Sequence, residues 1–170
     1  HPNGLGTYLF LDIEEYEGSW ENGKPQGSGV FRNTNYDYEG DFLDGIISGF
    51  GKITYKDTQD SYSGYFKNGV KDSIGEYSFK LGNFYKGGFK NDAFDGVGIF
   101  TYIDGSEYHG DFLDGRFYGA GSLFLNQEGG QSVFTGNWNG DGSFPEVGSI
   151  LFPNGDLYEG KLNNGKPTND

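Results

Sequence analysis

The chain repeats one stretch of sequence, Tyr38-Glu39-Gly40-Asp41-Phe42-Leu43-Asp44-Gly45, which is followed by Gly49-Phe50-Gly51 and by an alternating run that reaches Tyr55. Within this stretch an aromatic residue, a glycine and a second aromatic residue stand at every second position, and a glycine turn follows. Self-similarity at a period of about two dozen residues is typical of repeat proteins, in which each repeat is one supersecondary unit.

The repeat organises the whole chain. An aromatic-x-Gly start recurs at intervals of 22 to 26 residues, at Tyr16, Tyr38, Tyr62, Tyr85, Tyr108, Phe134 and Tyr158. We therefore expect one continuous array over residues 1–170, with partial repeats at 1–15 and 158–170. The complete repeats are expected at 16–37, 38–61, 62–84, 85–107, 108–133 and 134–157. Because both ends cut through a repeat and the sequence does not start with Met, we expect a piece of a longer protein.

Each repeat predicts a β-hairpin. In its first run Tyr38, Gly40 and Phe42 point to one face, while Glu39 and Asp41 point to the other, which indicates a strand with one buried and one solvated face. No segment shows helical periodicity. The sequence therefore predicts an all-β fold, an elongated and twisted single-layer antiparallel sheet of about fourteen strands built from consecutive hairpins.

The glycines have two predicted roles. Four dipeptides that accept positive φ end the first strand of a repeat, where a hairpin needs a tight turn; they are Asn22-Gly23, Asp44-Gly45, Asn68-Gly69 and Asp114-Gly115. Ser73 and Asp92 stand where two of the expected glycines are missing. A glycine inside a strand weakens it, so we expect the strand glycines to leave room for a large ring that lies across the sheet.

The composition argues against several classes of function. The net charge of −13 argues against nucleic acid as a partner. The absence of cysteine excludes disulfides and thiolate metal sites. No apolar run approaches the roughly 18 residues that a membrane span needs. These observations argue against a nucleic-acid-binding protein, a disulfide scaffold, a thiolate metal site and a membrane span.

Candidate chemistry is sparse. His109 lies between Tyr108 and Gly110 on the polar face of a predicted strand, and no nucleophile motif accompanies it. The run Asn137-x-Asn139-x-Asp141-Gly142 resembles the start of a calcium loop, but Gly148 stands where the bidentate Glu is required. We expect no enzymatic activity, no cofactor and no metal.

The spacing resembles the MORN repeat (membrane occupation and recognition nexus). Its pattern is Tyr-x-Gly-x-Phe, a Gly seven residues after the Tyr, and Gly-x-Gly at eleven and thirteen; the repeats that start at Tyr16, Tyr38 and Tyr108 match every position. The resemblance covers essentially the whole chain, although the repeat from Phe134 lacks the turn glycine. It implies a hairpin stack whose aromatic groove receives a partner segment or a second copy, in the cytoplasm, at cytoskeletal or membrane-associated complexes.

The aromatic face is the candidate binding site, because no helix covers it. We call the first aromatic residues the repeat tyrosines (Tyr16, Tyr38, Tyr62, Tyr85 and Tyr108) and the next ones the second rings (Trp20, Phe42, Phe66, Phe89 and Phe112). The second rings, together with Tyr38, Tyr62 and Tyr85, are predicted to line the partner-binding groove. The plainer interpretation, that all these rings form the core of the sheet, stays open.

Three other functions stay open as well. A basic middle segment suggests binding to phosphoinositides or a membrane surface through Lys52, Lys56, Lys67, Lys71, Lys86 and Lys90. The simpler interpretation is that these lysines keep exposed strands soluble. An aromatic groove also suits sugars or choline, and the chain can be the non-catalytic part of a larger enzyme.

Overall fold

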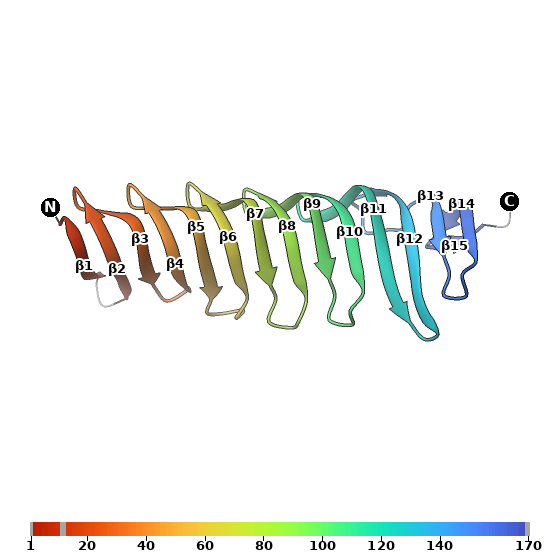
Figure 1. Ribbon diagram of the computed structural model, residues 1–170, viewed down its shortest axis with the longest axis horizontal. Coiled ribbons are helices and arrows are strands. Elements are labelled where there is room, and N and C mark those ends of the chain that lie inside the picture. The colour runs from red at the N-terminus through yellow and green to blue at the C-terminus, as the bar shows by residue number, and fades with distance from the viewer. Residues whose placement is uncertain (1, 11–12, 169–170) are drawn as a thin grey trace. The chain divides into compact units, whose positions relative to one another are not determined.

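The computed structural model describes residues 2–10 and 13–168, which form strands and turns only. The sheet has 15 antiparallel strands, and their order in the sheet follows their order in the chain from β1 to β15 (Figure 1). The predicted all-β architecture of consecutive hairpins is confirmed. The described residues contain no helix with the length and apolar character that crossing a membrane requires.

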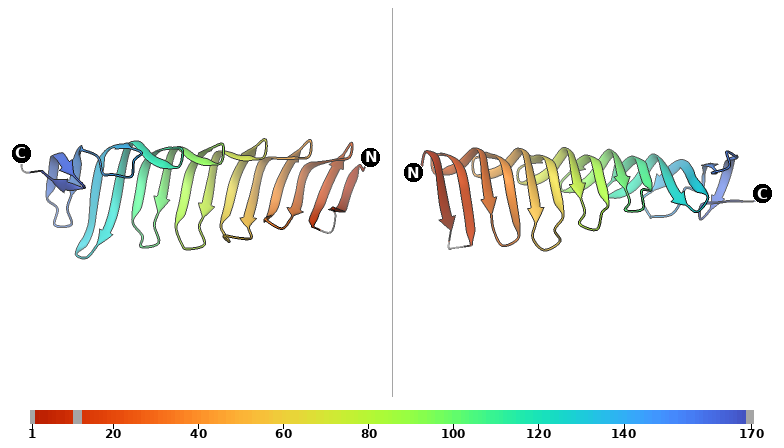
Figure 2. Two further views of the ribbon diagram at one scale, coloured as in Figure 1. Left: turned by 180° about the vertical axis from the view of Figure 1, so that it is seen from behind. Right: turned by 60° about the horizontal axis from the view of Figure 1, so that its bottom comes forward.

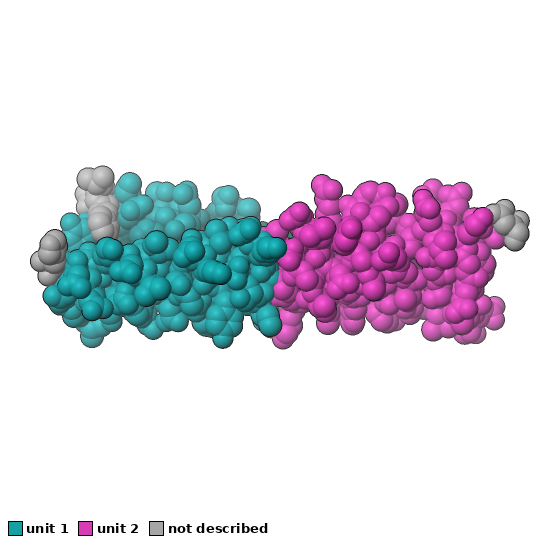
Figure 3. All heavy atoms as spheres, turned by 90° about the horizontal axis from the view of Figure 1, so that it is seen from above, with its two compact units in different colours: residues 1–81, 89–92 teal, residues 82–88, 93–170 magenta. Residues whose placement is uncertain are grey.

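The chain divides into two compact units, residues 1–81 with 89–92 and residues 82–88 with 93–170 (Figure 3). The first unit contains β1 (Gly4–Phe10), β2 (Glu14–Glu21), β3 (Lys24–Arg32), β4 (Tyr36–Leu43), β5 (Ile46–Tyr55), β6 (Ser61–Lys67) and β7 (Val70–Ser78). The second contains β9 (Ala93–Thr101), β10 (Glu107–Leu113), β11 (Arg116–Gln127), β12 (Gly130–Asn139), β13 (Val147–Leu151), β14 (Leu157–Asn163) and β15 (Lys166–Pro167). Strand β8 (Phe84–Lys90) contributes residues to both.

The hairpin turns have the predicted backbone. Asp44 and Gly45 have φ values of 53° and 86°, and the other three predicted dipeptides have positive φ at both residues as well. Asn91 and Asp92, at 49° and 70°, make the same kind of turn without a glycine. Positive φ at both central residues is the signature of the type I′ hairpin turn.

Each regular hairpin bends shortly before its turn. In the β4–β5 pair Gly40 lies opposite Gly51, but Phe42 lies opposite Ile47, so β5 carries extra residues at this point. Gly49, inside the extra segment, has a φ of 84°. The same register shift occurs in the pairs β2–β3, β6–β7 and β10–β11. Such bulges bend a strand, and Figure 2 shows hairpins of both units curling over at the end that carries the turns.

A repeat tyrosine lies flat on two paired glycines in each of these hairpins. Tyr16 covers Gly18 and Gly29, which are cross-strand partners. A Cβ atom built on Gly29 would lie 2.5 Å from the Tyr16 Oη and 2.6 Å from its Cε2. The same arrangement places Tyr38 on Gly40 and Gly51, Tyr62 on Gly64 and Gly75, Tyr85 on Gly87 and Gly98, and Tyr108 on Gly110 and Gly121. The prediction that the strand glycines make room for rings is confirmed.

The tyrosine hydroxyl also locks the bend. Tyr38 Oη donates a hydrogen bond to the carbonyl of Asp41 at 3.0 Å, and Asp41 is the residue at which the register shifts. Carbonyls at a bulge lose their ladder partner, so the hydroxyl satisfies a group that the bend has freed. Equivalent bonds join Tyr16 to Ser19, Tyr62 to Tyr65, Tyr85 to Gly88 and Tyr108 to Asp111, at 2.8 to 3.1 Å.

The rings of neighbouring repeats interlock within each unit. Tyr38 meets the edge of Phe42 at a centroid distance of 5.2 Å and 90°, and that of Phe66 at 5.4 Å and 88°. In the second unit, Tyr108 contacts Phe112 and Trp138 in the same way, at 5.2 Å and 5.4 Å. Edge-to-face pairs contribute about 0.5–1.5 kcal/mol each beyond the area they bury. The ladder of rings is therefore the hydrophobic core of each unit.

Substituting Gly29→Ala is expected to lower the free energy of unfolding by about 2–3 kcal/mol, because the added methyl group overlaps the rigid ring of Tyr16. Urea denaturation measures the change. Gly6→Ala is the matched control, since its Cβ would meet only Trp20, at 3.8 Å. Equal losses of unfolding free energy in the two variants would show that the Tyr16 ring is not the reason for glycine at position 29.

Substituting Ser73→Gly is expected to raise the free energy of unfolding by about 0.5–1 kcal/mol. Ser73 occupies a bulge position with a φ of 68°, a conformation that costs a side-chain-bearing residue about 1–2 kcal/mol and that glycine adopts freely. Ser78→Gly, in the same strand at negative φ, is expected to lower it. Thermal unfolding of both variants tests this, and a destabilised Ser73→Gly protein would contradict it.

Alkaline pH is expected to destabilise the fold. Burial, together with nearby carboxylates, raises the pKa of Tyr38, Tyr62 and Tyr85 well above the ordinary value, and raises that of Tyr108 to about 12. Since the unfolded chain ionises near pH ~10, these tyrosines stabilise fully below that pH and lose their contribution as the pH rises toward the folded-state values. Urea titrations between pH ~8 and ~11 measure this loss of stability. A constant free energy of unfolding over this range would contradict the prediction.

Candidate functional site

The face that carries the rings, the ring face, is largely closed by its own side chains. The repeat tyrosines are at most 1% exposed, and the second rings are 3 to 8% exposed. The residues predicted to line the partner-binding groove therefore form the core. A partner on this face meets their edges at most, and the exposed surface belongs to other residues.

Part of this closure comes from the ninth residue after each repeat tyrosine, which we call the cap residue. In the second unit Phe94 stacks on Tyr85 at 3.8 Å and 17°, and Phe117 stacks on Tyr108 at 3.7 Å and 8°. These tyrosines thus lie between a glycine pair and a cap ring. The cap residues are Pro25, Ile47, Lys71, Phe94 and Phe117.

Lys71 is a charged cap residue, and its ammonium lies among aromatic rings. Its Nζ is 2.9 Å from the Tyr55 hydroxyl oxygen and 3.2 Å from Asp92 Oδ1. It also lies 5.3 to 5.8 Å from the ring centroids of Tyr55, Tyr62 and Tyr77, within cation–π range. The lysine side chain is only 10% exposed. Lys71 is buried on the ring face and already paired, so its position does not favour the predicted role in a lipid-binding patch.

The other predicted lipid-binding lysines are exposed, namely Lys52, Lys56, Lys67 and Lys90 in the first unit and Lys86 in the second. Lys56 is engaged, since its Nζ contacts Asp37 Oδ1 at 2.8 Å and donates to the carbonyl of Asn33 at 2.8 Å. Lys52 lies opposite Glu39 in the ladder. Neighbouring acidic and carbonyl groups thus offset part of this basic segment.

The first unit retains an open groove on the ring face, with a volume of about 410 Å³. We call it the ring-face groove; it is lined by Glu14, Tyr16, Pro25, Phe31, Tyr36, Phe42, Gly45, Ile46, Ile47 and Gly69. Tyr16 and Phe42, which meet edge to face at 5.0 Å, are the buried members. Phe31 and Tyr36, 5.8 Å apart, are half-buried, and so is Ile47. Burial, and secondarily the charge of Glu14, raises the pKa of Tyr36.

The opposite face, which we call the outer face, holds a second hollow in the first unit, of about 630 Å³. This outer hollow is lined by Ser28, Gly29, Val30, Glu39, Gly40, Asp41, Phe50, Gly51, Lys52 and Ser63. Three of these residues are glycines that Tyr16 and Tyr38 require on the ring face. The Cβ positions of these glycines point to the ring face, so only their backbone faces this hollow.

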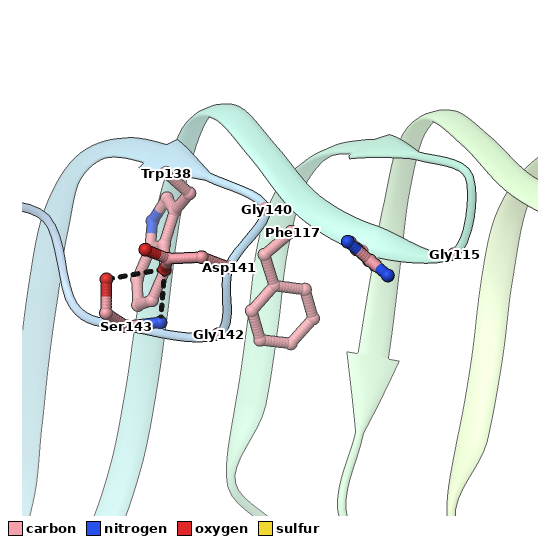
Figure 4. Close-up of a pocket in the computed structure, with 8 residues that line it drawn as sticks. Gly115, Phe117, Trp138, Gly140, Asp141, Gly142 and Ser143 are labelled. Carbon is pink, nitrogen blue, oxygen red and sulfur yellow. Dashed lines mark hydrogen bonds between the residues drawn. The ribbon is translucent and has the colours of Figure 1, made fainter.

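The second unit has a hollow of about 460 Å³ beside a loop that replaces the regular turn after β12 (Figure 4). It lies between Phe117, Trp138 and the loop residues around Asp141. Figure 4 shows the Asp141 carboxylate turned toward Ser143, whose backbone N–H and hydroxyl both donate to Oδ1, at 2.7 and 2.5 Å. These bonds lower the pKa of Asp141.

The loop that resembles the start of a calcium loop uses its polar side chains for hydrogen bonds within the loop. Asn139 Nδ2 donates to Asp141 Oδ2 at 3.0 Å, and the Asp141 N–H donates to Asn139 Oδ1 at 3.0 Å. The side chains thus close the loop on itself, as Asx turns do. Over residues 2–10 and 13–168, no three His, Asp or Glu side chains gather as metal ligands. His109, the histidine considered above, has its Nε2 atom 2.7 Å from Glu107 Oε2.

Sequence reasoning missed the cap residues and the apolar side chains of the outer face. The cap residues carried a signal, since the ninth position after the repeat tyrosine is apolar in Pro25, Ile47, Phe94 and Phe117. The bulge obscured it, because the regular alternation of faces is interrupted just after this position.

The repeat geometry agrees with a comparison to known families. A family model for the MORN repeat matches residues 16–37, 38–58, 62–83 and 85–107, together just over half of the chain. Each matched segment holds one repeat tyrosine with its glycine pair. MORN repeats are generally modules for interaction with proteins or membranes. This chain belongs to the MORN-repeat family.

Proposed function

We propose that this chain is a non-catalytic scaffold or adaptor module that holds a segment of a partner protein, or of a second copy, in the ring-face groove. Through this contact it would tether cytoskeletal or membrane-associated complexes. The observation that carries the proposal is the groove itself, an apolar depression bordered by half-buried Phe31, Tyr36 and Ile47.

The rigidity of the groove supports this function. Tyr16 is fixed on its glycine pair and its hydroxyl donates to the carbonyl of Ser19 at 2.9 Å, so the ring cannot swing away. Phe42 is fixed between Tyr16 and Tyr38. A preformed apolar surface loses little conformational entropy on binding, which favours affinity.

We expect an extended or helical partner segment with apolar side chains, because most residues that line the groove are apolar. Half-buried rings such as Phe31 and Tyr36 still offer apolar area, and a tyrosine adds a polar tip at the rim. Phe42, one of the second rings, lines the groove directly and lies opposite the cap residue Ile47 in the ladder.

Binding to a phosphoinositide or membrane surface is the alternative, and fewer groups now support it. Lys71 is buried and Lys56 is paired with Asp37, which leaves Lys52, Lys67 and Lys90 in the first unit. A juxtamembrane basic residue contributes about 1 kcal/mol to binding at an anionic surface. Because three such residues contribute little attraction in an acidic chain, a protein partner is favoured over a lipid surface.

Substituting Ile47→Phe is expected to weaken binding of the partner at least tenfold by filling the ring-face groove. The partner is first recovered by pull-down with the intact chain, and its affinity for each variant is then measured by isothermal titration calorimetry. The fold should tolerate this change, because Phe94 and Phe117 occupy the same position in later repeats.

The matched control is Phe50→Ser, which alters the outer face and leaves the ring-face groove unchanged. Unaltered affinity in a folded Ile47→Phe protein would show that the partner does not use the groove. Loss of binding in Phe50→Ser alone would place the contact on the outer face.

A further inference from the structure

The outer face of the first unit carries an exposed apolar cluster, which we call the outer patch: Phe50, Tyr65 and Ile74. They are 52%, 51% and 67% exposed. Phe50 and Tyr65 lie directly opposite each other in the β5–β6 ladder, with ring centroids 5.6 Å apart at 76°. Ile74 precedes Gly75, the cross-strand partner of Gly64, and Tyr65 follows Gly64, so Tyr65 and Ile74 both lie at the bend of this hairpin.

The fold does not require this cluster. One repeat earlier, the positions of Phe50 and Tyr65 are taken by Ser28 and Asp41, which also lie directly opposite each other. Ser28 Oγ donates to Asp41 Oδ1 at 3.0 Å, so a polar pair satisfies the same backbone geometry. Exposed rings where a polar pair suffices indicate an interaction surface.

The outer hollow adjoins the outer patch, so one partner segment can contact both. Phe50 belongs to both, so its ring forms the boundary between the hollow and the patch. The backbone of Gly40 and Gly51 lies in the hollow, where a neighbouring chain can approach closely. A side chain entering the hollow would thus pass over the ring of Phe50.

The charges in the outer hollow favour a cation. Glu39 and Lys52 are cross-strand neighbours, and opposite charges at such positions offset each other. Asp41 remains, and its carboxylate accepts a hydrogen bond from the neutral hydroxyl of Ser28. A carboxylate next to an aromatic ring suits a guanidinium, which pairs with the first and stacks on the second.

We propose that the outer hollow and the outer patch together dock a protein segment that presents an arginine next to an apolar side chain. The arginine enters the hollow, pairs with Asp41 and stacks on Phe50. The apolar side chain covers Tyr65 and Ile74. This surface lies opposite the ring-face groove, so both can be occupied at once and the chain can bridge two partners.

The test uses two synthetic hexapeptides, one alternating arginine with leucine and one alternating glutamate with leucine, each titrated into the isotopically labelled chain. The arginine peptide is expected to shift the amide NMR signals of Gly40 and Gly51 in a saturable way, and the glutamate peptide is not. Equal shifts with both peptides would overturn the proposal.

The decisive variant is the double substitution Phe50→Ser and Tyr65→Asp, which copies the Ser28–Asp41 pair of the preceding repeat and should therefore fold. It is expected to bind the arginine peptide at least tenfold more weakly. Because the variant is more acidic than the parent, mere attraction of a basic peptide to an acidic protein would instead strengthen binding. Unchanged or stronger binding would overturn the proposal.

Three further experiments test whether the peptide binds at the outer patch. Two of them use variants, and the third measures self-association. Ile47→Phe is expected to leave the affinity for the arginine peptide unchanged, and a tenfold loss there would overturn the proposal by assigning the peptide to the ring-face groove. The single variant Ile74→Ser, which keeps Phe50 and Tyr65, is expected to weaken binding about threefold. Concentration-dependent dimerisation of the parent that the double variant abolishes would overturn the proposal in favour of a second copy.

Discussion

A tyrosine ring lying flat on two paired glycines is the contact on which the rest of this structure depends. Any side chain at Gly18 or Gly29 would displace the Tyr16 ring, and without the ring the bend in the hairpin would leave the carbonyl of Ser19 without its donor. The ring then offers its edge and face to neighbouring rings. One local packing solution therefore fixes the hairpin, its curvature and its contact with the next repeat.

Much of this followed from the sequence, because the pattern repeats and each copy supports the others. The alternation of Tyr38, Gly40 and Phe42 predicted the strand and its faces, and Asp44-Gly45 predicted the turn. The register shift after Gly40 was not predicted, although Gly49, which has a φ of 84° inside the extra segment, is the kind of strand glycine that marks a bulge. This shift decides which residues close the ring face.

The candidate site was harder to predict for the same reason. The second rings are aromatic in every regular repeat, which suggested a binding surface, but interlocking with the repeat tyrosines buries them. Among the positions that vary from repeat to repeat, Phe31 and Ile47 are half-buried and Phe50 is exposed. In a repeat protein, positions required by every repeat serve the fold, and specificity falls to positions that the fold leaves unconstrained.

The cap residues show how such freedom arises. The turn N–H of each hairpin donates to the backbone carbonyl of the cap residue before it, as Gly69 does to Ile47 at 2.9 Å and Asp92 to Lys71 at 3.1 Å. The fold thus uses the main chain of the cap residue and places no demand on its side chain, so Pro, Ile, Lys and Phe all occur there. Mutation can therefore change the chemistry of the ring face repeat by repeat while the hydrogen bond between hairpins is inherited intact.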